Sequence, residues 1–365
     1  MSGIYISYPF CNQKCSFCNF ASGVFSAGTK SQYHRLLENE VRAHTWSWLP
    51  ETLYFGGGTP SLMPPELLVR LINAIPKTRL TEITLECAPG TLTAENVEQW
   101  ARCGINRVSL GVQSFVTAEL RQTGRCHDAE VVSRDIALLR SRGIQNINID
   151  LIAGLPGQTA QSWQHSLEWL ERLMPPHVSV YIFEIDEDSR LGNELLLGGT
   201  RYGAPSVPGD DAMADFYEAA VERLTLLAIE RYEISNFARP GFQSRHNLKY
   251  WQLEPYIGFG LDAHSFDGAR RWSNPDTFVA YFTQQESGLT VLRNTLPANV
   301  LEERFFVGLR LMRGIEPTVE EWSNFARPIQ KHLNTGMLER DGNRLRLSSR
   351  AVLLSNEILE EFIHA

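Results

Sequence analysis

The feature that most restricts the fold is an alternation of short apolar runs with amphipathic segments along the first half of the 365-residue chain. The apolar runs, rich in residues that favour strands, occupy positions 3–9, 52–58, 82–87, 107–113, 146–154 and 178–185. Between them, apolar residues recur at helical spacing near 31–46, 65–75, 94–103, 128–142 and 160–173. Six such units in series predict an α/β protein, with a parallel sheet and helices on its outer face.

The second half of the chain has a different pattern. Residues 191–209 are rich in Gly and Pro, which indicates a connecting loop, and a helix is expected at 210–229. From about residue 292, helices are followed by a strand, a DGN turn and a strand, as in a winged helix. Ten Lys plus Arg balance ten Asp plus Glu over 288–365, which favours a structural or lid role over nucleic-acid binding. We expect domains at 1–190, 191–287 and 288–365.

Charge and hydropathy argue against two kinds of partner. The formal net charge of −8 disfavours general binding of nucleic acid, because such binding depends on Lys and Arg that neutralise phosphates. No apolar run approaches the roughly 20 residues that cross a bilayer. The N-terminal residues also lack the basic and apolar regions of a signal peptide. We therefore expect a cytoplasmic protein.

Glycine and polar residues occur where the predicted strands end. The set comprises Gly56-Gly57-Gly58-Thr59 after the second run, Glu86 at the end of the third, Gln113 after the fourth and Asp150 in the fifth. In parallel barrels and open α/β sheets, active sites form at the carboxyl ends of the strands. These residues are therefore expected to lie together and form one site.

Three cysteines follow the first predicted strand, in the stretch "YPFCNQKCSFCNF" at Cys11, Cys15 and Cys18. A structural zinc site needs four ligands, and the sequence has no second CxxC. A [4Fe-4S] cluster held by three thiolates leaves one iron open to another molecule. The spacing favours such a cluster over zinc. The remaining cysteines, Cys87, Cys103 and Cys126, are scattered and are expected to be ordinary buried residues.

Together these motifs resemble the radical S-adenosylmethionine (SAM) superfamily, in which CxxxCxxC follows a short strand at the head of a β/α series. Within it, "YISYPFCNQKCSFCNF", "YFGGGTPSL", "GVQSF", "DLIAGLPGQT" and "RHNLKYW" are similar, in order, to the HemN/HemW group of heme-related proteins. The resemblance covers almost the whole chain. It implies a partial (β/α)6 radical SAM barrel with an α+β extension and a C-terminal winged-helix-like domain.

The resemblance also implies the cofactors and their ligands. The three cysteines would hold a [4Fe-4S] cluster, whose open iron chelates S-adenosylmethionine, and an electron donor would supply the electron that cleaves it to a 5′-deoxyadenosyl radical. The matched SAM positions are Tyr5, Phe17, Gly57, Gly58, Thr59, Glu86, Gln113, Arg125, Asp150 and Glu184. Ala88 in "CAPGT" departs from the group, which usually has Asn there, so an amide contact at this position is not expected.

The group contains an oxygen-independent coproporphyrinogen III oxidase and heme carriers. The oxidase pattern continues CxxxCxxCxC, whereas here Phe20 replaces the last cysteine, and the oxidase carries an N-terminal extension while this first strand starts almost at Met1. "HNLKYW" matches the HNxxYW signature of the carriers, which implies that His246, Tyr250 and Trp251 bind heme. Imidazole is a usual axial ligand of heme iron.

We therefore predict a heme chaperone that transfers heme to apo-hemoproteins and lacks coproporphyrinogen oxidase activity. The alternative is the oxidase itself, which decarboxylates propionate side chains. A radical methyltransferase or heme-opening enzyme is a weaker third reading. The identity of the acceptor, a homodimer and a transient membrane contact stay open at this point.

Overall fold

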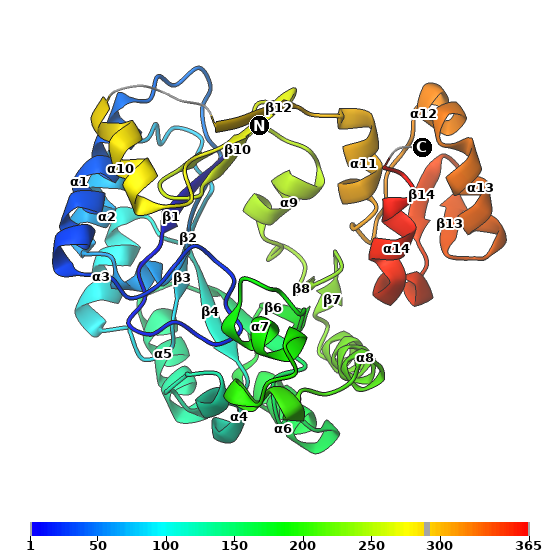
Figure 1. Cartoon of the computed structure of the whole chain (residues 1–365), viewed down its shortest axis with the longest axis horizontal. Helices are drawn as coiled ribbons and strands as arrows, with labels where there is room; N and C mark the ends of the chain where they lie inside the picture. Colours follow the sequence, from blue (N-terminus) through cyan, green and yellow to red (C-terminus); the bar gives the residue numbers. More distant parts are fainter. Residues whose placement is uncertain (1, 288–292, 364–365) are drawn as a thin grey trace.

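The computed structural model describes residues 2–287 and 293–363, and its main element is a 12-stranded mixed sheet. The strands lie side by side in the order β12-β11-β10-β9-β1-β2-β3-β4-β5-β6-β8-β7. Six of them are parallel and in chain order: β1 (Gly3–Tyr8), β2 (Thr52–Gly57), β3 (Glu82–Cys87), β4 (Arg107–Gln113), β5 (Asn146–Ala153) and β6 (His177–Ile182). Figure 1 shows these strands in an arc, with helices along its outer side. The α/β class and the predicted parallel sheet are confirmed.

One helix or a pair of helices follows each of these strands. These helices are α1 (Ala27–Ala43), α2 (Pro65–Asn73), α3 (Ala94–Cys103), α4 (Thr117–Gln122), α5 (Ala129–Ser141), α6 (Ala160–Leu173), α7 (Arg190–Leu196) and α8 (Asp210–Leu226). Local sequence sets their ends: the Thr93 hydroxyl accepts from the Asn96 amide at the start of α3, and Gly104 closes it with φ of 101°. Ser, Thr and Asp cap other starts in the same way. The predicted helices at 94–103 and 160–173 match residue for residue.

The two faces of the strands differ in polarity, because successive side chains point to opposite sides. On β1 and β2, the buried residues Ile4, Ile6, Leu53 and Phe55 belong to the main hydrophobic core. The side chains of the other face are largely polar, and the register brings them together across strands as Thr84↔Arg107, Glu86↔Ser109, Ser109↔Asn148 and Asp150↔Ser179. The barrel interior is therefore a polar cavity and not a packed core.

Residues after Glu230 extend both edges of the sheet. Beside β6 lie β8 (Asn236–Ala238) and β7 (Glu230–Arg231), both in antiparallel pairs. Beside β1 lies β9 (Tyr256–Phe259), which is parallel to it, and then β10 (His264–Phe266), β11 (Arg270–Ser273) and β12 (Arg293–Pro297). Two helices complete this part, α9 (Arg245–Trp251) and α10 (Phe278–Ser287). The middle of the chain thus continues the sheet of the barrel.

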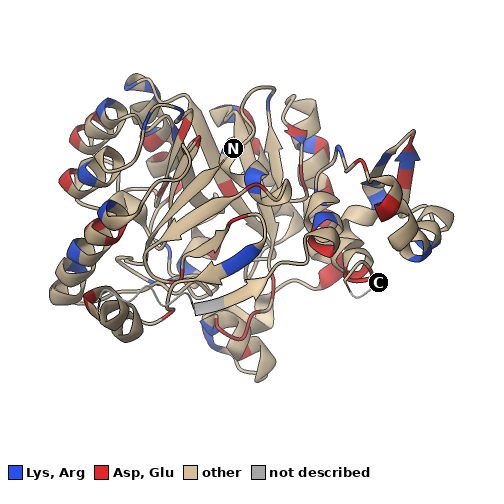
Figure 2. Cartoon of the chain, turned by 90° about the horizontal axis from the view of Figure 1, so that it is seen from above, with Lys and Arg blue, Asp and Glu red and all other residues tan. Residues whose placement is uncertain are grey.

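The C-terminal part has a small hydrophobic cluster of its own, around Phe305, Phe325 and Phe362. Its elements are α11 (Val300–Gly308), α12 (Val319–Asn324), α13 (Ala326–Asn334), the hairpin β13 (Leu338–Asp341) and β14 (Arg344–Leu347), and α14 (Ser355–Glu360). The expected strand, DGN turn and strand are present, with Gly342 at φ of 60°. Charges of both signs are interspersed on this part (Figure 2). The predicted boundary at 287–288 adjoins residues 288–292, which lie outside the described ones.

No helix within the described residues is long and apolar enough to cross a membrane.

Candidate functional site

A cavity of about 770 Å³ lies inside the barrel, toward the carboxyl ends of the parallel strands. Its lining includes most of the residues that the sequence singled out: Cys11, Cys15, Phe17, Cys18, Gly57, Gly58, Thr59, Glu86, Gln113, Arg125, Asp150 and Glu184. They come from the ends of β1 to β6 and from the loops that follow. The structure therefore brings them to one site.

The cysteine loop after β1 is tied to three distant parts of the chain. Cys11 N donates to Gly23 O at 2.8 Å, Ser16 N donates to Thr123 O at 3.1 Å, and Ser16 O accepts from Leu191 N at 2.8 Å. All three thiols are free, and burial raises the pKa of Cys11. Within the described residues, no three Cys, His, Asp or Glu converge closely enough to bind one metal ion. Three thiols around a cavity suit a larger ligand, such as a cluster with iron at several corners.

The glycine-rich turn after β2 packs directly against the cysteine loop. Gly57 has φ of 109°, a conformation that glycine adopts without strain. A Cβ on Gly58 would lie 2.9 Å from Phe10 O and 3.0 Å from Cys11 Sγ. The Thr59 amide donates to Phe10 O at 2.9 Å, which fixes the two loops to each other. Cys11 can therefore lie this close to the turn only because residue 58 has no side chain.

Two partly buried carboxyl groups face the cavity from β3 and β5. The Glu86 carboxylate accepts from Tyr54 Oη at 2.8 Å and from Gly57 N at 3.2 Å, and burial raises its pKa to about 7. Asp150 accepts from Ser109 Oγ at 3.0 Å and from Asn148 Nδ2 at 2.7 Å, and burial raises its pKa as well. A cationic group of a ligand would favour the ionised form of either carboxyl.

Gln113 and Arg125 leave polar atoms unpaired beside these carboxyls. Gln113 has φ of 70°, which is rare for a residue other than glycine, and its Oε1 is buried without a partner in residues 2–287 and 293–363. Arg125 donates from Nη1 to Gly111 O at 2.9 Å, while its buried Nε has no partner in the same described ranges. Strained backbone and unsatisfied buried polar groups occur mainly where a ligand binds. These atoms, with the glycine cradle, fit a polar cofactor in the cavity.

The structure differs from the expectation for Tyr5. Tyr5 is not among the residues that line the cavity, but its ring stacks on Tyr54, with centroids 6.1 Å apart, and Tyr54 does line it. Sequence reasoning missed further lining residues: Tyr54, Arg107, Ser109, Asn148, Ser179, Tyr181 and Asn247. Polar residues at alternate positions of otherwise apolar strands, as in "RVSLGVQ", are the signal that would have found several of them.

The signature "HNLKYW" forms α9, which lies against the starts of β2 and β3. The Glu82 carboxylate accepts from the backbone amides of Arg245 and His246, at 3.0 Å each. His246 is 1% exposed, with Nδ1 2.8 Å from Thr52 Oγ1 and Nε2 2.8 Å from Tyr250 Oη. Burial lowers its pKa to about 3, so the imidazole is neutral. In this conformation neither ring nitrogen of His246 is free for iron, unlike the expectation of an open axial ligand.

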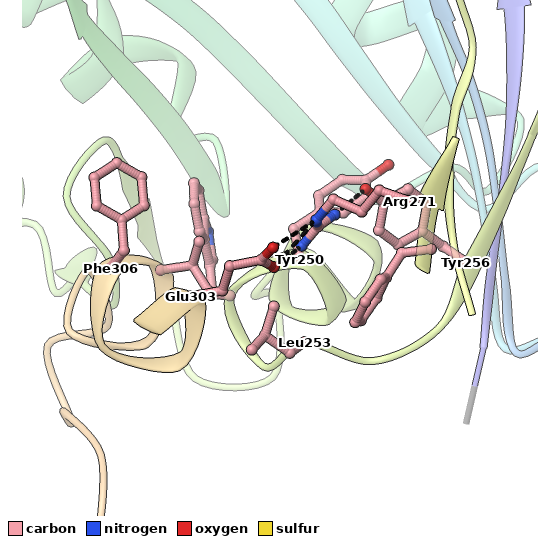
Figure 3. Close-up of a pocket in the computed structure, with 9 residues that line it drawn as sticks. Tyr250, Leu253, Tyr256, Arg271, Glu303 and Phe306 are labelled. Atoms are coloured by element: carbon pink, nitrogen blue, oxygen red, sulfur yellow. Dashed lines mark hydrogen bonds and ion pairs between the residues drawn. The ribbon is translucent and has the colours of Figure 1, made fainter. Parts of the chain in front are cut away.

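The other two predicted heme residues line a second, smaller pocket of about 370 Å³ between α9, the β9–β11 strands and α11 (Figure 3). Its lining is mostly aromatic and aliphatic: Tyr250, Trp251, Leu253, Tyr256, Phe266, Phe306 and Val307. The Arg271 guanidinium pairs with Glu303 at 2.5 Å on one side and donates to Tyr256 Oη at 2.9 Å. His246 lines neither pocket, although its Nε2 contacts Tyr250 Oη, which belongs to a residue that lines the smaller one.

Comparison with known proteins shows which family the chain resembles. Residues 5–170, which span β1 to α6, match the Radical SAM superfamily. Similar proteins named heme chaperone HemW occur in Lactococcus lactis, at 31% identity over 98% of this chain and 96% of that protein, and in Bacillus subtilis, at 30% identity over 100% and 99%. The HemW of Escherichia coli is 35% identical, over 72% of this chain and 69% of that protein.

The fold and the strand-end cavity define a protein of the radical SAM superfamily, which implies a [4Fe-4S] cluster and S-adenosylmethionine. Within that superfamily, the chain belongs to the HemW family. The structure of coproporphyrinogen III oxidase HemN from Escherichia coli superposes with a TM-score of 0.85 at 22% identity, over 100% of this chain and 90% of that one. This last match shows the shared fold.

Proposed function

We propose that this protein is a heme chaperone that binds heme and transfers it to apo-hemoproteins, on a radical SAM core. The observation that carries the proposal is the match to proteins named heme chaperone HemW over 98% of the chain, which includes the signature helix. Phe20 adds support, because it lies at the cavity where the oxidase pattern has a further cysteine, and its side chain is exposed.

The proposed cofactor site uses residues that the cavity already assembles. Cys11, Cys15 and Cys18 would hold the [4Fe-4S] cluster, which with S-adenosylmethionine bound supplies one-electron chemistry when an electron donor reduces it. Gly57, Gly58 and Thr59 would admit the methionine end close to the backbone. Glu86 would hold the amino group there, and Phe17, Gln113, Arg125, Asp150 and Glu184 would surround the nucleoside and carboxylate. Tyr5 would act through Tyr54.

The proposed heme site centres on α9. Tyr250 and Trp251 offer aromatic surface in the smaller pocket, where rings pack favourably on a macrocycle. The Nε2 of His246 is turned toward Tyr250 Oη, so ligation of iron by this atom requires that hydrogen bond to open. Because Tyr250 itself lines the pocket, a heme that displaces its ring would release the imidazole at the same time.

The function is tested with anaerobically reconstituted protein. Heme titration is expected to give a saturable Soret band at one heme per chain, and incubation with coproporphyrinogen III, S-adenosylmethionine and a reductant is expected to leave the substrate unchanged. Conversion to protoporphyrinogen would establish the oxidase instead. A change of heme itself that depends on S-adenosylmethionine would establish the methyltransferase or heme-opening reading.

A further inference from the structure

Arg107 is a buried cation inside the barrel, and its side chain has no partner among the described residues. It stands at the start of β4, is 1% exposed and lines the larger cavity. Within residues 2–287 and 293–363, its side chain makes no hydrogen bond and no ion pair, and its Nε is buried and unpaired. The guanidinium carries five donors and stays charged. Burial of such a group is costly unless an anion or acceptors compensate it.

The protein's own carboxylates interact with this charge only at longer range, and within the described residues none of them makes an ion pair or a hydrogen bond with it. Glu86 and Asp150 act on Arg107 only as charges at longer range, since neither is within ion-pair distance. Their oxygens are held instead by four other donors, from Tyr54, Gly57, Ser109 and Asn148. A guanidinium that faces a cavity while its nearest carboxylates are occupied elsewhere is arranged for an anion that comes from outside.

We propose that Arg107 binds a carboxylate of the ligand, in the form of a propionate side arm of the porphyrin. Asn247 of the signature helix lines the same cavity, and its side-chain amide makes no hydrogen bond within the described part of the chain, so it adds a donor. The inference rests on the proposed heme function and deepens it, because it names the part of heme that enters the barrel. Arg125 is bonded to Gly111 O and serves the cofactor end.

The test compares heme with heme dimethyl ester, in which both propionates are neutral. Each is titrated into the reconstituted wild type, Arg107→Gln, Arg107→Lys and Arg125→Gln. The wild type is expected to prefer free heme by about tenfold or more, as for a hydrogen-bonded charge pair. Arg107→Gln should lose this preference by binding free heme more weakly, and Arg107→Lys should keep part of it. Arg125→Gln should weaken binding of S-adenosylmethionine and retain the preference.

The possible outcomes test separately the carboxylate subsite, its assignment to Arg107 and the proposed heme function. A wild type that binds the ester as tightly as heme overturns the carboxylate subsite, whatever the variants do. A preference that persists in Arg107→Gln, with iron content and Tm unchanged, overturns the assignment to Arg107. If Arg107→Gln does not fold, the comparison of heme with its ester in the wild type still tests the carboxylate subsite. The same comparison in Arg107→Lys, which keeps the charge, still tests the assignment to Arg107. A wild type that binds no heme refutes the proposed function, and the subsite with it.

Discussion

The cysteine end of the barrel and the signature helix differ in how they treat their polar groups. At the cysteine end, Gln113 Oε1 and Arg125 Nε are buried without partners among the described residues, and Gly58, where a Cβ would collide with Phe10 O and Cys11 Sγ, lets the cysteine loop pack close to the glycine turn. At the signature helix, both nitrogens of His246 are bonded within the protein. The first region offers unpaired polar atoms to a ligand without a rearrangement, whereas the second must break internal hydrogen bonds to bind one.

The largest effect is expected from the cluster ligands. Anaerobic reconstitution should give about four irons and four sulfides per chain, and Ser at Cys11, Cys15 or Cys18 should abolish the cluster. Ser at Cys87, Cys103 or Cys126 is the matched control and should leave the iron content unchanged. Iron and sulfide analysis with the visible spectrum measures this. Zinc that persists in the wild type under these conditions would contradict the assignment.

The glycine cradle should be nearly as sensitive. A Cβ at position 58 would meet Phe10 O and Cys11 Sγ, so Gly58→Ala should displace the cysteine loop, lower the cluster content and destabilise the fold by about 1–3 kcal/mol. Gly28→Ala in α1 is the control, since its Cβ would approach only Ser26 Oγ, at 3.7 Å. Iron content and urea unfolding report both effects. Wild-type values for Gly58→Ala would show that the two loops are not interdependent.

The third prediction concerns Glu86 and pH. Its folded pKa, about 7, lies above the ordinary value of 4.5, so the cost of ionising it is absent below pH 4.5 and grows as pH rises toward 7. A cationic amino group that pairs with the carboxylate must displace this proton below pH 7. Affinity for S-adenosylmethionine, read from the EPR signal of the reduced cluster, should therefore fall by roughly fivefold from pH 7 to pH 6.

Glu86→Gln is the matched variant, with nearly the same shape and no charge. It should bind S-adenosylmethionine about tenfold or more weakly at pH 8 and lose the pH dependence between 6 and 8. An unchanged dependence in the variant would assign the titration to another group, such as Asp150, whose pKa burial also raises.

The smallest effects are expected at the signature helix, where two substitutions should change heme binding in opposite directions. Tyr250→Phe removes the hydroxyl bonded to His246 Nε2, so it should free this nitrogen and tighten heme binding by about five- to tenfold. His246→Ala should keep the cluster but give a shifted or diminished Soret band. If Tyr250→Phe binds heme with wild-type affinity and spectrum, His246 is not the axial ligand and serves to hold α9 against β2.

Local order along the chain predicts part of the cysteine end: the three cysteines, the glycine turn, Glu86, Gln113 and Asp150. Each of these lies at or just after the end of a strand that its own apolar pattern reveals, and parallel strands place their carboxyl ends together. The strands 82–87 and 107–113 were predicted to the residue for this reason. Phe17, Arg125 and Glu184 were matched only through the resemblance to the family. Alternation of polar residues also predicts an inward face, although it does not show that Arg107 lacks a partner there.

The signature helix could not be placed in this way. Its position depends on Glu82, whose carboxylate accepts from residues 163 and 164 positions later in the chain, and β9 pairs with β1 across a still larger gap, with Tyr256 opposite Gly3. No local pattern specifies such pairings. The motif identified His246 as notable but could not reveal that Thr52 and Tyr250 occupy both of its nitrogens.

Transfer of heme tests the account most directly. Reconstituted protein loaded with one heme is mixed anaerobically with an apo-hemoprotein whose holo form has a distinct absorption spectrum. We predict that the holo spectrum of the acceptor appears as the Soret band of the donor is lost. We also predict that His246→Ala and Arg107→Gln load a different amount of heme from the wild type, and hence deliver a different amount to the acceptor. Heme that stays on the wild-type protein in the presence of several apo-hemoproteins, or a protein that converts coproporphyrinogen III instead, would contradict the account.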